Sequence, residues 1–169
     1  MGCDIHLFVE YRFRAGHFGS LTTDEFSLPR NYAIFGALAG VRMKELAHIA
    51  VRGFPDDASD YAQEAYYWRV CEEADYSDGF DGIWFTVLPK DAEDYIHRGF
   101  SRKKPGPRSD LISDPDAHHA SWLTAPEFRD ALTVAATASG EPSQEYLAVA
   151  AALHVLEPDE SRVVFWFDN

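Results

Sequence analysis

Residues 3–10 of the chain read CDIHLFVE, and the strand that this stretch predicts is the starting point for the fold. Every second side chain in it is apolar, which is the two-residue period of a β-strand with one buried face. A second apolar strand, SRVVFWFDN, lies at 161–169. Because both stretches are rich in β-branched and aromatic residues, we expect the strand starting at Gly2 to be central and to pair with the strand ending at Asp168.

Helical patterns occupy much of the chain between these two strands. The clearest helix start is at Thr124, where Glu127 three residues later completes a capping box. Gly140 is the expected end of that helix, and Gly40 is the expected end of an earlier one. We expect helices over 30–40, 59–71, 91–97, 124–139 and the stretch after Pro142. A loop is expected at 76–82 and a buried strand at 83–88.

These elements together predict an α+β fold. The chain has 169 residues, a length that suits one domain, so we expect a single α+β domain over residues 1–169. The expected architecture is a small, mostly antiparallel sheet, with the N- and C-terminal strands at its centre and helices packed on it. The basic stretch RGFSRKKPGPR at 98–108 contains two prolines and two glycines, which predict an exposed, mobile loop.

Composition excludes several classes of function. The formal net charge of −13 disfavours general nucleic-acid binding and attraction to anionic membranes. Two cysteines are too few for a disulfide framework and indicate a reducing compartment. Without an apolar run of about 20 residues we expect no membrane span. The expected location is the cytoplasm, which would be the bacterial host cytosol for a phage-encoded protein.

Three polar side chains share one face of the first strand. Asp4 and His6 lie two residues apart, so their side chains start about 7 Å from each other and can converge on one ligand. A carboxylate beside a histidine can orient the ring for acid–base catalysis, and Glu10 extends the same face. If a divalent metal ion is needed, Asp4 and His6 are the expected ligands; the chemistry also works without a cofactor. The alternative is a strand face that simply meets solvent.

A second group of candidates precedes the capped helix, in the sequence HHASW at 118–122. We expect His118 in a loop just before the helix N-terminus, where free N–H groups attract an anion. Ser121 and Trp122 are candidates for contacting that ligand. We therefore expect His6 and His118 to face one pocket, although two exposed loop histidines, His118 and His119, fit the sequence as well.

Three further residues stand near predicted helix starts and turns. Arg30 and Asn31 precede a helix, and Arg52 precedes a proline-containing turn. A guanidinium group can hold a phosphate, so these residues are expected to contribute to ligand binding. The alternative is that each arginine forms a structural ion pair.

Five segments together resemble a family of small, uncharacterised bacteriophage and bacterial proteins. The motifs are MGCDIH followed by a glutamate, RNY…LAGVR, an RG-P-D-S turn, H-x-x-SWL and a C-terminal R-x-VFxFDN, which lie here at 1–10, 30–42, 52–59, 118–123 and 162–169. The chain departs from the pattern at His119, where a small polar residue is expected, and in the basic stretch at 98–108. The resemblance implies a polar pocket organised around an Asp, a His, a Glu, an Arg and a second His. The first strand, with Asp4, His6 and Glu10, is expected to form one wall, and His118 with the helix after Thr124 the other.

Three functions follow from these residues and this resemblance. The first is a phage-type anti-defence enzyme that hydrolyses a phosphorylated, nucleotide-like molecule by histidine acid–base chemistry, as a phosphodiesterase does. The second is a non-catalytic sponge, often a homo-oligomer, that sequesters a nucleotide immune signal such as a cyclic dinucleotide or an ADP-ribose derivative. The third is a protein-binding accessory factor. The nucleotide-signal step rests on association with phage genomes and not on residue chemistry.

Overall fold

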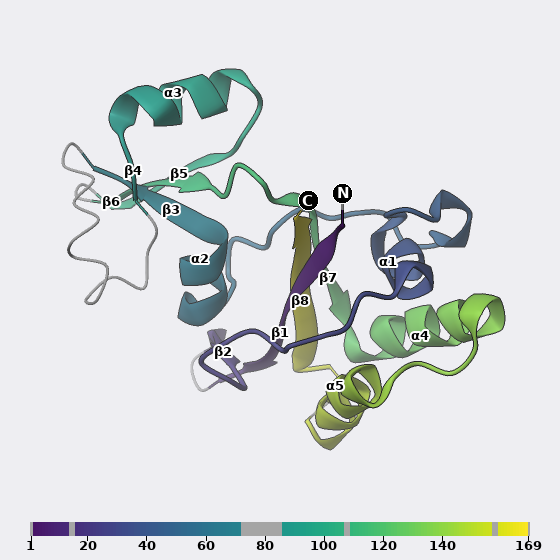
Figure 1. Ribbon diagram of the computed structural model, residues 1–169. Helices are drawn as coiled ribbons and strands as arrows, with labels where there is room; N and C mark the ends of the chain where they lie inside the picture. The colour runs from purple at the N-terminus through teal and green to yellow at the C-terminus, as the bar shows by residue number, and fades with distance from the viewer. Residues whose placement is uncertain (1, 14–15, 72–85, 107–108, 157–158, 169) are drawn as a thin grey trace. The chain divides into compact units, whose positions relative to one another are not determined.

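The computed structural model describes residues 2–13, 16–71, 86–106, 109–156 and 159–168, and it has the predicted α+β fold. The chain divides into two compact units, one formed by Met1–Asp60 with His118–Asn169 and the other by Tyr61–Ala117 (Figure 1). The organisation of residues 1–169 as one domain stays a prediction.

The first unit contains a four-stranded antiparallel sheet. Its strand order is β2-β1-β8-β7, with β2 at Phe18–Ser20, β1 at Asp4–Arg12, β8 at Ser161–Asp168 and β7 at His118–Thr124. The pairing of β1 with β8 runs from Asp4 opposite Asp168 to Tyr11 opposite Ser161. The predicted central pair is therefore confirmed, with the first strand beginning two residues later than expected.

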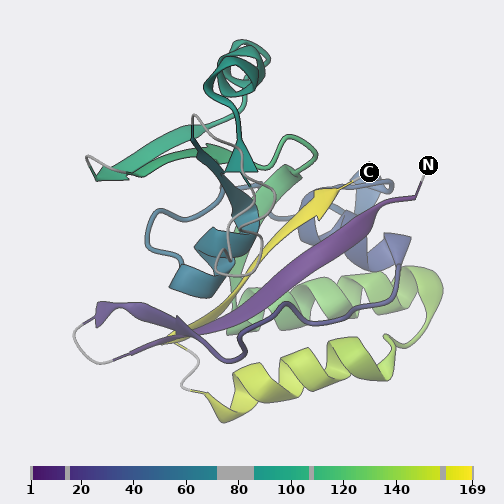
Figure 2. The ribbon, with the colours of Figure 1, turned by 60° about the vertical axis from the view of Figure 1, so that its left-hand side comes forward.

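Three helices cover one face of this sheet (Figure 2). They are α1 at Tyr32–Ala39, α4 at Ala125–Ser139 and α5 at Gln144–Val155, and a 3-10 turn, η2, follows α1 at Lys44–Leu46. The apolar residues of β1 and β8 that point to this side are fully or almost fully buried among the helices: Ile5, Leu7, Val9, Val163, Phe165 and Phe167. The two-residue period of both strands produces this core because alternate side chains reach the same face.

Local sequence signals define where these helices begin and end. At the start of α4 the hydroxyl of Thr124 accepts from the backbone N–H of Glu127, and the carboxylate of Glu127 accepts from the backbone N–H of Thr124 at 2.9 Å. Gly40 ends α1 in the left-handed conformation, with φ of 72°, and Gly140 follows α4. The helices expected at 30–40 and 124–139 and after Pro142 are thus confirmed.

The opposite face of the sheet carries the polar residues of β1 and β8. Trp166 is almost fully buried there, and the ring of Phe54 packs edge-on against it at 5.9 Å between centroids. Phe18 covers the guanidinium group of Arg162 at 3.6 Å. The residues predicted to share one face of the first strand, Asp4, His6 and Glu10, lie on this polar side.

The second unit contains another four-stranded sheet, of order β4-β3-β6-β5. Its elements are α2 at Asp60–Tyr66, β3 at Tyr67–Val70, β4 at Thr86–Val87, α3 at Pro89–His97, β5 at Arg102–Gly106 and β6 at Ser109–Ser113. The loop expected at 76–82 and the start of the strand expected at 83–88 lie outside the described residues. The rest of that strand corresponds to β4.

Two predictions for this unit are wrong. The helix expected at 59–71 ends at Tyr66, because aromatic residues favour a strand and Tyr67–Val70 pair with β6. The basic stretch at 98–108 is not a loop throughout, since Arg102–Gly106 form β5. This strand lies at the sheet edge, where proline is tolerated, and the guanidinium of Arg102 bonds to carboxylates of Glu93 and Asp110.

Candidate functional site

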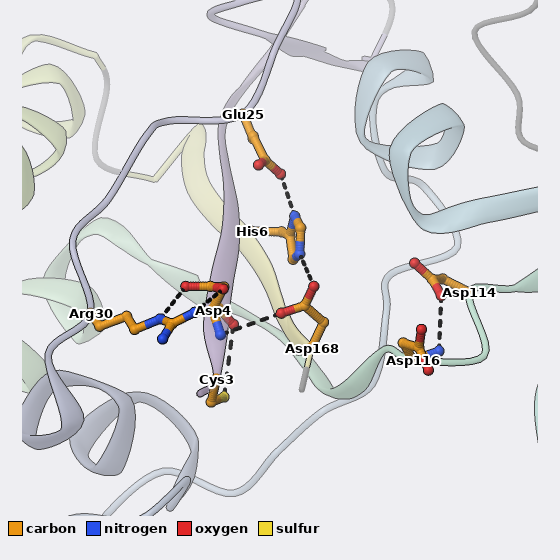
Figure 3. Close-up of polar contacts among 8 residues, drawn as sticks. All are labelled: Cys3, Asp4, His6, Glu25, Arg30, Asp114, Asp116 and Asp168. Carbon is orange, nitrogen blue, oxygen red and sulfur yellow. Dashed lines mark hydrogen bonds and ion pairs between the residues drawn. The ribbon is translucent and has the colours of Figure 1, made fainter. Parts of the chain in front are cut away.

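The imidazole of His6 lies between two carboxylates on the polar face of the first unit (Figure 3). Its Nδ1 lies 2.5 Å from Oε2 of Glu25, and its Nε2 lies 3.3 Å from Oδ2 of Asp168. The ring stacks on Trp166, with 5.2 Å between centroids and 8° between planes. Trp166 pairs with His6 across β1 and β8, so the strand register itself places one ring over the other.

The two carboxylates favour the protonated form of His6. Burial lowers the pKa of the imidazole, but the hydrogen bonds and negative charges of Glu25 and Asp168 outweigh it, so the pKa lies above its ordinary value of 6.5. Because this raised pKa belongs to the folded state, the contacts stabilise the fold fully below the unfolded pKa. That contribution is lost as the pH rises through the folded pKa.

A bidentate ion pair lies next to His6 at the start of β1. Nε and Nη2 of Arg30 each donate to one oxygen of Asp4, both at 2.6 Å. The guanidinium group keeps the pKa of Asp4 below its ordinary value. Gly2 leaves the space for this contact, because a Cβ there would lie 2.1 Å from Nη1 of Arg30.

Asp168 connects the two pairs. Its Oδ1 accepts from the backbone N–H of Asp4 at 3.3 Å, while its other oxygen faces His6. We call these five residues the His6 network: Asp4, His6, Glu25, Arg30 and Asp168. The network combines an imidazole whose pKa is raised with a half-exposed guanidinium, which are the groups that acid–base chemistry on an anionic substrate needs.

His118 does not belong to this network. It begins β7 and does not lie in a loop, and it pairs with Phe167 of β8. Its ring stacks on Phe167 at 6.0 Å, on the helix-covered face, whereas His6 stacks on Trp166 on the opposite face. The prediction that His6 and His118 face one pocket is therefore wrong, because consecutive residues of β8 point to opposite sides of the sheet.

Glu10 lies on the same face as His6 but is fully buried in an ion-pair cluster of its own. One carboxylate oxygen accepts from the backbone N–H of Ser59 at 2.6 Å, and the other accepts from Nε of Arg162 at 2.8 Å. Arg162 also donates to a carboxylate oxygen of Asp57 at 2.9 Å. Both oxygens of Glu10 thus hold the fold together, which favours a structural role over the ligand contact expected for it.

Three of the expected ligand contacts, Arg52, Ser121 and Trp122, form a cluster at the start of α4. Arg52 donates to both oxygens of Glu127 and lies over the ring of Trp122 at 4.4 Å, while its backbone N–H bonds to the hydroxyl of Ser121. Arg52 keeps the pKa of Glu127 at about 2. The carboxylate of Glu127 therefore already supplies the negative charge that the helix N-terminus was expected to attract from a ligand.

Asn31 caps α1, and its side-chain oxygen accepts from the backbone N–H groups of Ala33 and Ile34, each at 3.1 Å. It is thus a structural cap, although it was expected to contact ligand. Within the described ranges, no group of three or more His, Cys, Asp or Glu side chains is arranged to hold a metal ion. The carboxylate of Asp4 binds Arg30 and the ring nitrogens of His6 face carboxylates, so neither side chain points at a shared metal position.

Two members of the network were missed by the sequence reasoning. Asp168 is found by extending the predicted strand pair, since the register places it opposite Asp4. Glu25 lies in the connection between β2 and α1, where no periodicity exists to assign it a neighbour. Its neighbour Phe26 donates its backbone N–H to the carbonyl of Leu7, which brings the segment alongside β1.

Comparison with known proteins identified no relative. No protein-family model, curated protein or solved structure matches this chain. Among the residues that the structure describes, no helix has both the length and the apolar character required to cross a bilayer. The resemblance to a phage protein family stays a prediction.

Proposed function

We propose that the His6 network acts on a phosphorylated, nucleotide-like small molecule and hydrolyses it by acid–base chemistry, with one histidine in place of the expected pair. The observation that carries this proposal is the imidazole of His6, held between Glu25 and Asp168 with a raised pKa. A histidine whose pKa is raised toward neutrality is a competent general acid.

Each residue has a definite part in the proposed reaction. Glu25 orients the ring through Nδ1, as a carboxylate partner does for other catalytic histidines. The contact between Nε2 and Asp168 is long at 3.3 Å, so a substrate oxygen can take its place. The oxygen of a water molecule bonds to phosphorus as the P–O bond to the leaving group breaks. His6 donates its Nε2 proton to the leaving oxygen, and a proton of the attacking water passes to solvent, from which His6 is protonated again.

Arg30 is the proposed phosphate-holding group. Its side chain is about half exposed, and it presents a guanidinium group at the edge of the network even while bound to Asp4. Guanidinium groups bind phosphate in the same two-pronged geometry in which this one binds carboxylate. Local cations of this kind can attract an anionic substrate although the whole chain carries a net charge of −13.

The test is incubation of the purified protein with a panel of cyclic dinucleotides and ADP-ribose derivatives, followed by denaturation and chromatography. We expect turnover by the wild type, and by His118→Gln because His118 lies on the other face of the sheet. His6→Gln should lower the rate by about 100-fold or more, the usual contribution of general acid–base catalysis. Full activity of His6→Gln against a hydrolysed member would overturn the proposal.

A second function is favoured by one specific observation. Both ring nitrogens of His6 already face a carboxylate, which suits a binding contact as well as proton transfer. A sponge for a nucleotide immune signal, acting in the bacterial cytosol and assembled as a homo-oligomer, would use Arg30 and His6 for affinity alone. Denaturation would then release an intact ligand in a fixed ratio to the chain, and His6→Gln would weaken binding without any product being formed.

A further inference from the structure

The two adjacent histidines at the start of β7 have an unusual geometry. Consecutive side chains of a strand normally point to opposite faces. His119 instead has a positive φ of 51°, and the pairing of β7 with β8 shifts register between His118 and Ser121. As a result the two rings meet, with 4.9 Å between centroids, 83° between planes and 2.8 Å between their Nδ1 atoms.

This arrangement does not contribute to the core through His119. The left-handed conformation is unfavourable in free energy for a residue other than glycine. His119 is exposed, so burial of its own ring does not offset that free energy. His118 is held more firmly, because its ring stacks on Phe167. The backbone therefore brings an exposed imidazole next to one whose orientation is held by stacking.

We propose that His118 and His119 bind a first-row transition-metal ion through their two Nδ1 atoms, as neighbouring ligands of a tetragonal ion such as Cu²⁺. Metal–nitrogen bonds are about 2.0 Å long, so two nitrogens at a right angle lie about 2.8 Å apart, whereas a tetrahedral ion separates them by about 3.3 Å. In the structure the two Nδ1 atoms lie 2.8 Å apart as a hydrogen-bonded pair, so an ion that replaces the proton between them finds both nitrogens at the spacing that a right angle requires. Imidazole nitrogens in tetragonal geometry are typical ligands of Cu²⁺ and Ni²⁺.

Binding requires only local changes. The rings must turn about their Cβ–Cγ bonds so that both nitrogen lone pairs point at one position, and this torsion is broad for histidine. Each ring then ligates as neutral imidazole with its proton on Nε2, and any further proton of the pair goes to solvent. No described group of three or more candidate ligands exists, so water completes the coordination. The site is separate from the His6 network, which lies on the other face of the sheet.

The test is titration of the tag-free full chain with Cu²⁺, followed by calorimetry and by electron paramagnetic resonance. We expect one ion per chain and a spectrum split by two imidazole nitrogens. His118→Gln and His119→Asn should each weaken binding at least tenfold. Asparagine is chosen because it tolerates a positive φ, so the backbone of β7 is kept. The matched control is His154→Gln, an exposed histidine on α5, which should bind like the wild type.

Several results would overturn the proposal. They are wild-type affinity in either His118→Gln or His119→Asn, an equal loss in His154→Gln, or a spectrum with a single nitrogen ligand. Thermal unfolding of each variant without metal separates lost ligation from lost structure. If His119→Asn unfolds at a lower temperature than the wild type, the test rests on His118→Gln alone. Weaker Cu²⁺ binding by a folded His118→Gln variant supports the site, and unchanged binding refutes it.

Discussion

Replacing Glu10 by glutamine tests whether this residue holds the fold or contacts ligand. In the structure its two oxygens accept from Ser59 and Arg162, and the carboxylate is fully buried. Glutamine keeps the size of the side chain but places an amide donor or a neutral carbonyl against the guanidinium of Arg162. The variant therefore leaves the buried guanidinium of Arg162 without the negative charge of Glu10 that balances it.

The expected loss of stability follows from this geometry. Removing one partner of a buried ion pair destabilises a fold by about 3–5 kcal/mol. Arg162 keeps a hydrogen bond to Asp57 at 2.9 Å, and Asp57 is 62% exposed, so we expect the lower end of that range. For a chain of this size about 3 kcal/mol corresponds to a fall of about 6–12 °C in the melting temperature.

The assay is urea unfolding of Glu10→Gln, of Arg162→Met and of the double variant. The double variant should lose less than the sum of the two single losses, because the pair acts as a unit. The control is Glu160→Gln, which removes an exposed ion pair with Arg12 and should change stability by at most about 1 kcal/mol. A loss below about 1 kcal/mol in Glu10→Gln, together with weaker ligand binding, would refute the structural role and restore the ligand contact.

Three other variants test the site and the fold. Glu25→Gln removes the nearer carboxylate, so the pKa of His6 should fall toward its ordinary value, as followed by ring-proton NMR titration. Gly2→Ala places a Cβ on the guanidinium of Arg30 and disturbs its ion pair with Asp4. The pKa of Asp4 should therefore rise toward its ordinary value, as measured by carboxyl-carbon NMR. Thr124→Ala removes half of the capping box and should destabilise α4 by about 1 kcal/mol in urea unfolding.

Each of these expectations has a clear contrary result. An unchanged pKa of His6 in Glu25→Gln would mean that the contact between Nδ1 of His6 and Glu25 does not raise the pKa of the imidazole. An unchanged pKa of Asp4 in Gly2→Ala would show that Arg30 still forms its ion pair with Asp4 in another side-chain conformation. A fully stable Thr124→Ala would mean that the N–H groups of α4 are satisfied without the cap.

The sequence predicted the frame of the site better than the site itself. The alternation in β1 placed Asp4 and His6 on one face, and the same period in β8 placed Trp166 and Asp168 there once the two strands were paired. Glu25 could not be predicted in this way. Its contact with His6 joins positions 19 residues apart through a segment without periodicity, so only the tertiary path of that segment decides it.

The contacts of two arginines also depended on long-range structure. Arg52 and Arg162 were visible as cations in the sequence, but their bidentate and buried contacts with Glu127 and Glu10 join segments 75 and 152 positions apart. A short-range pattern cannot distinguish a cation that awaits a phosphate from one that already holds a carboxylate. The structure assigns both to internal pairs.

What the sequence by itself determined is local: the two apolar strands, the capping box at Thr124 and the glycine that ends α1. Each depends on side chains within a few residues, where backbone geometry alone sets which face a residue occupies. What only the tertiary structure decided is which faces and partners meet. His118 lies on the far side of the sheet from His6 because it pairs with Phe167, and the register shift and positive φ at His119 accompany this pairing. That outcome comes from strand pairing across almost 50 residues, and no local period encodes it.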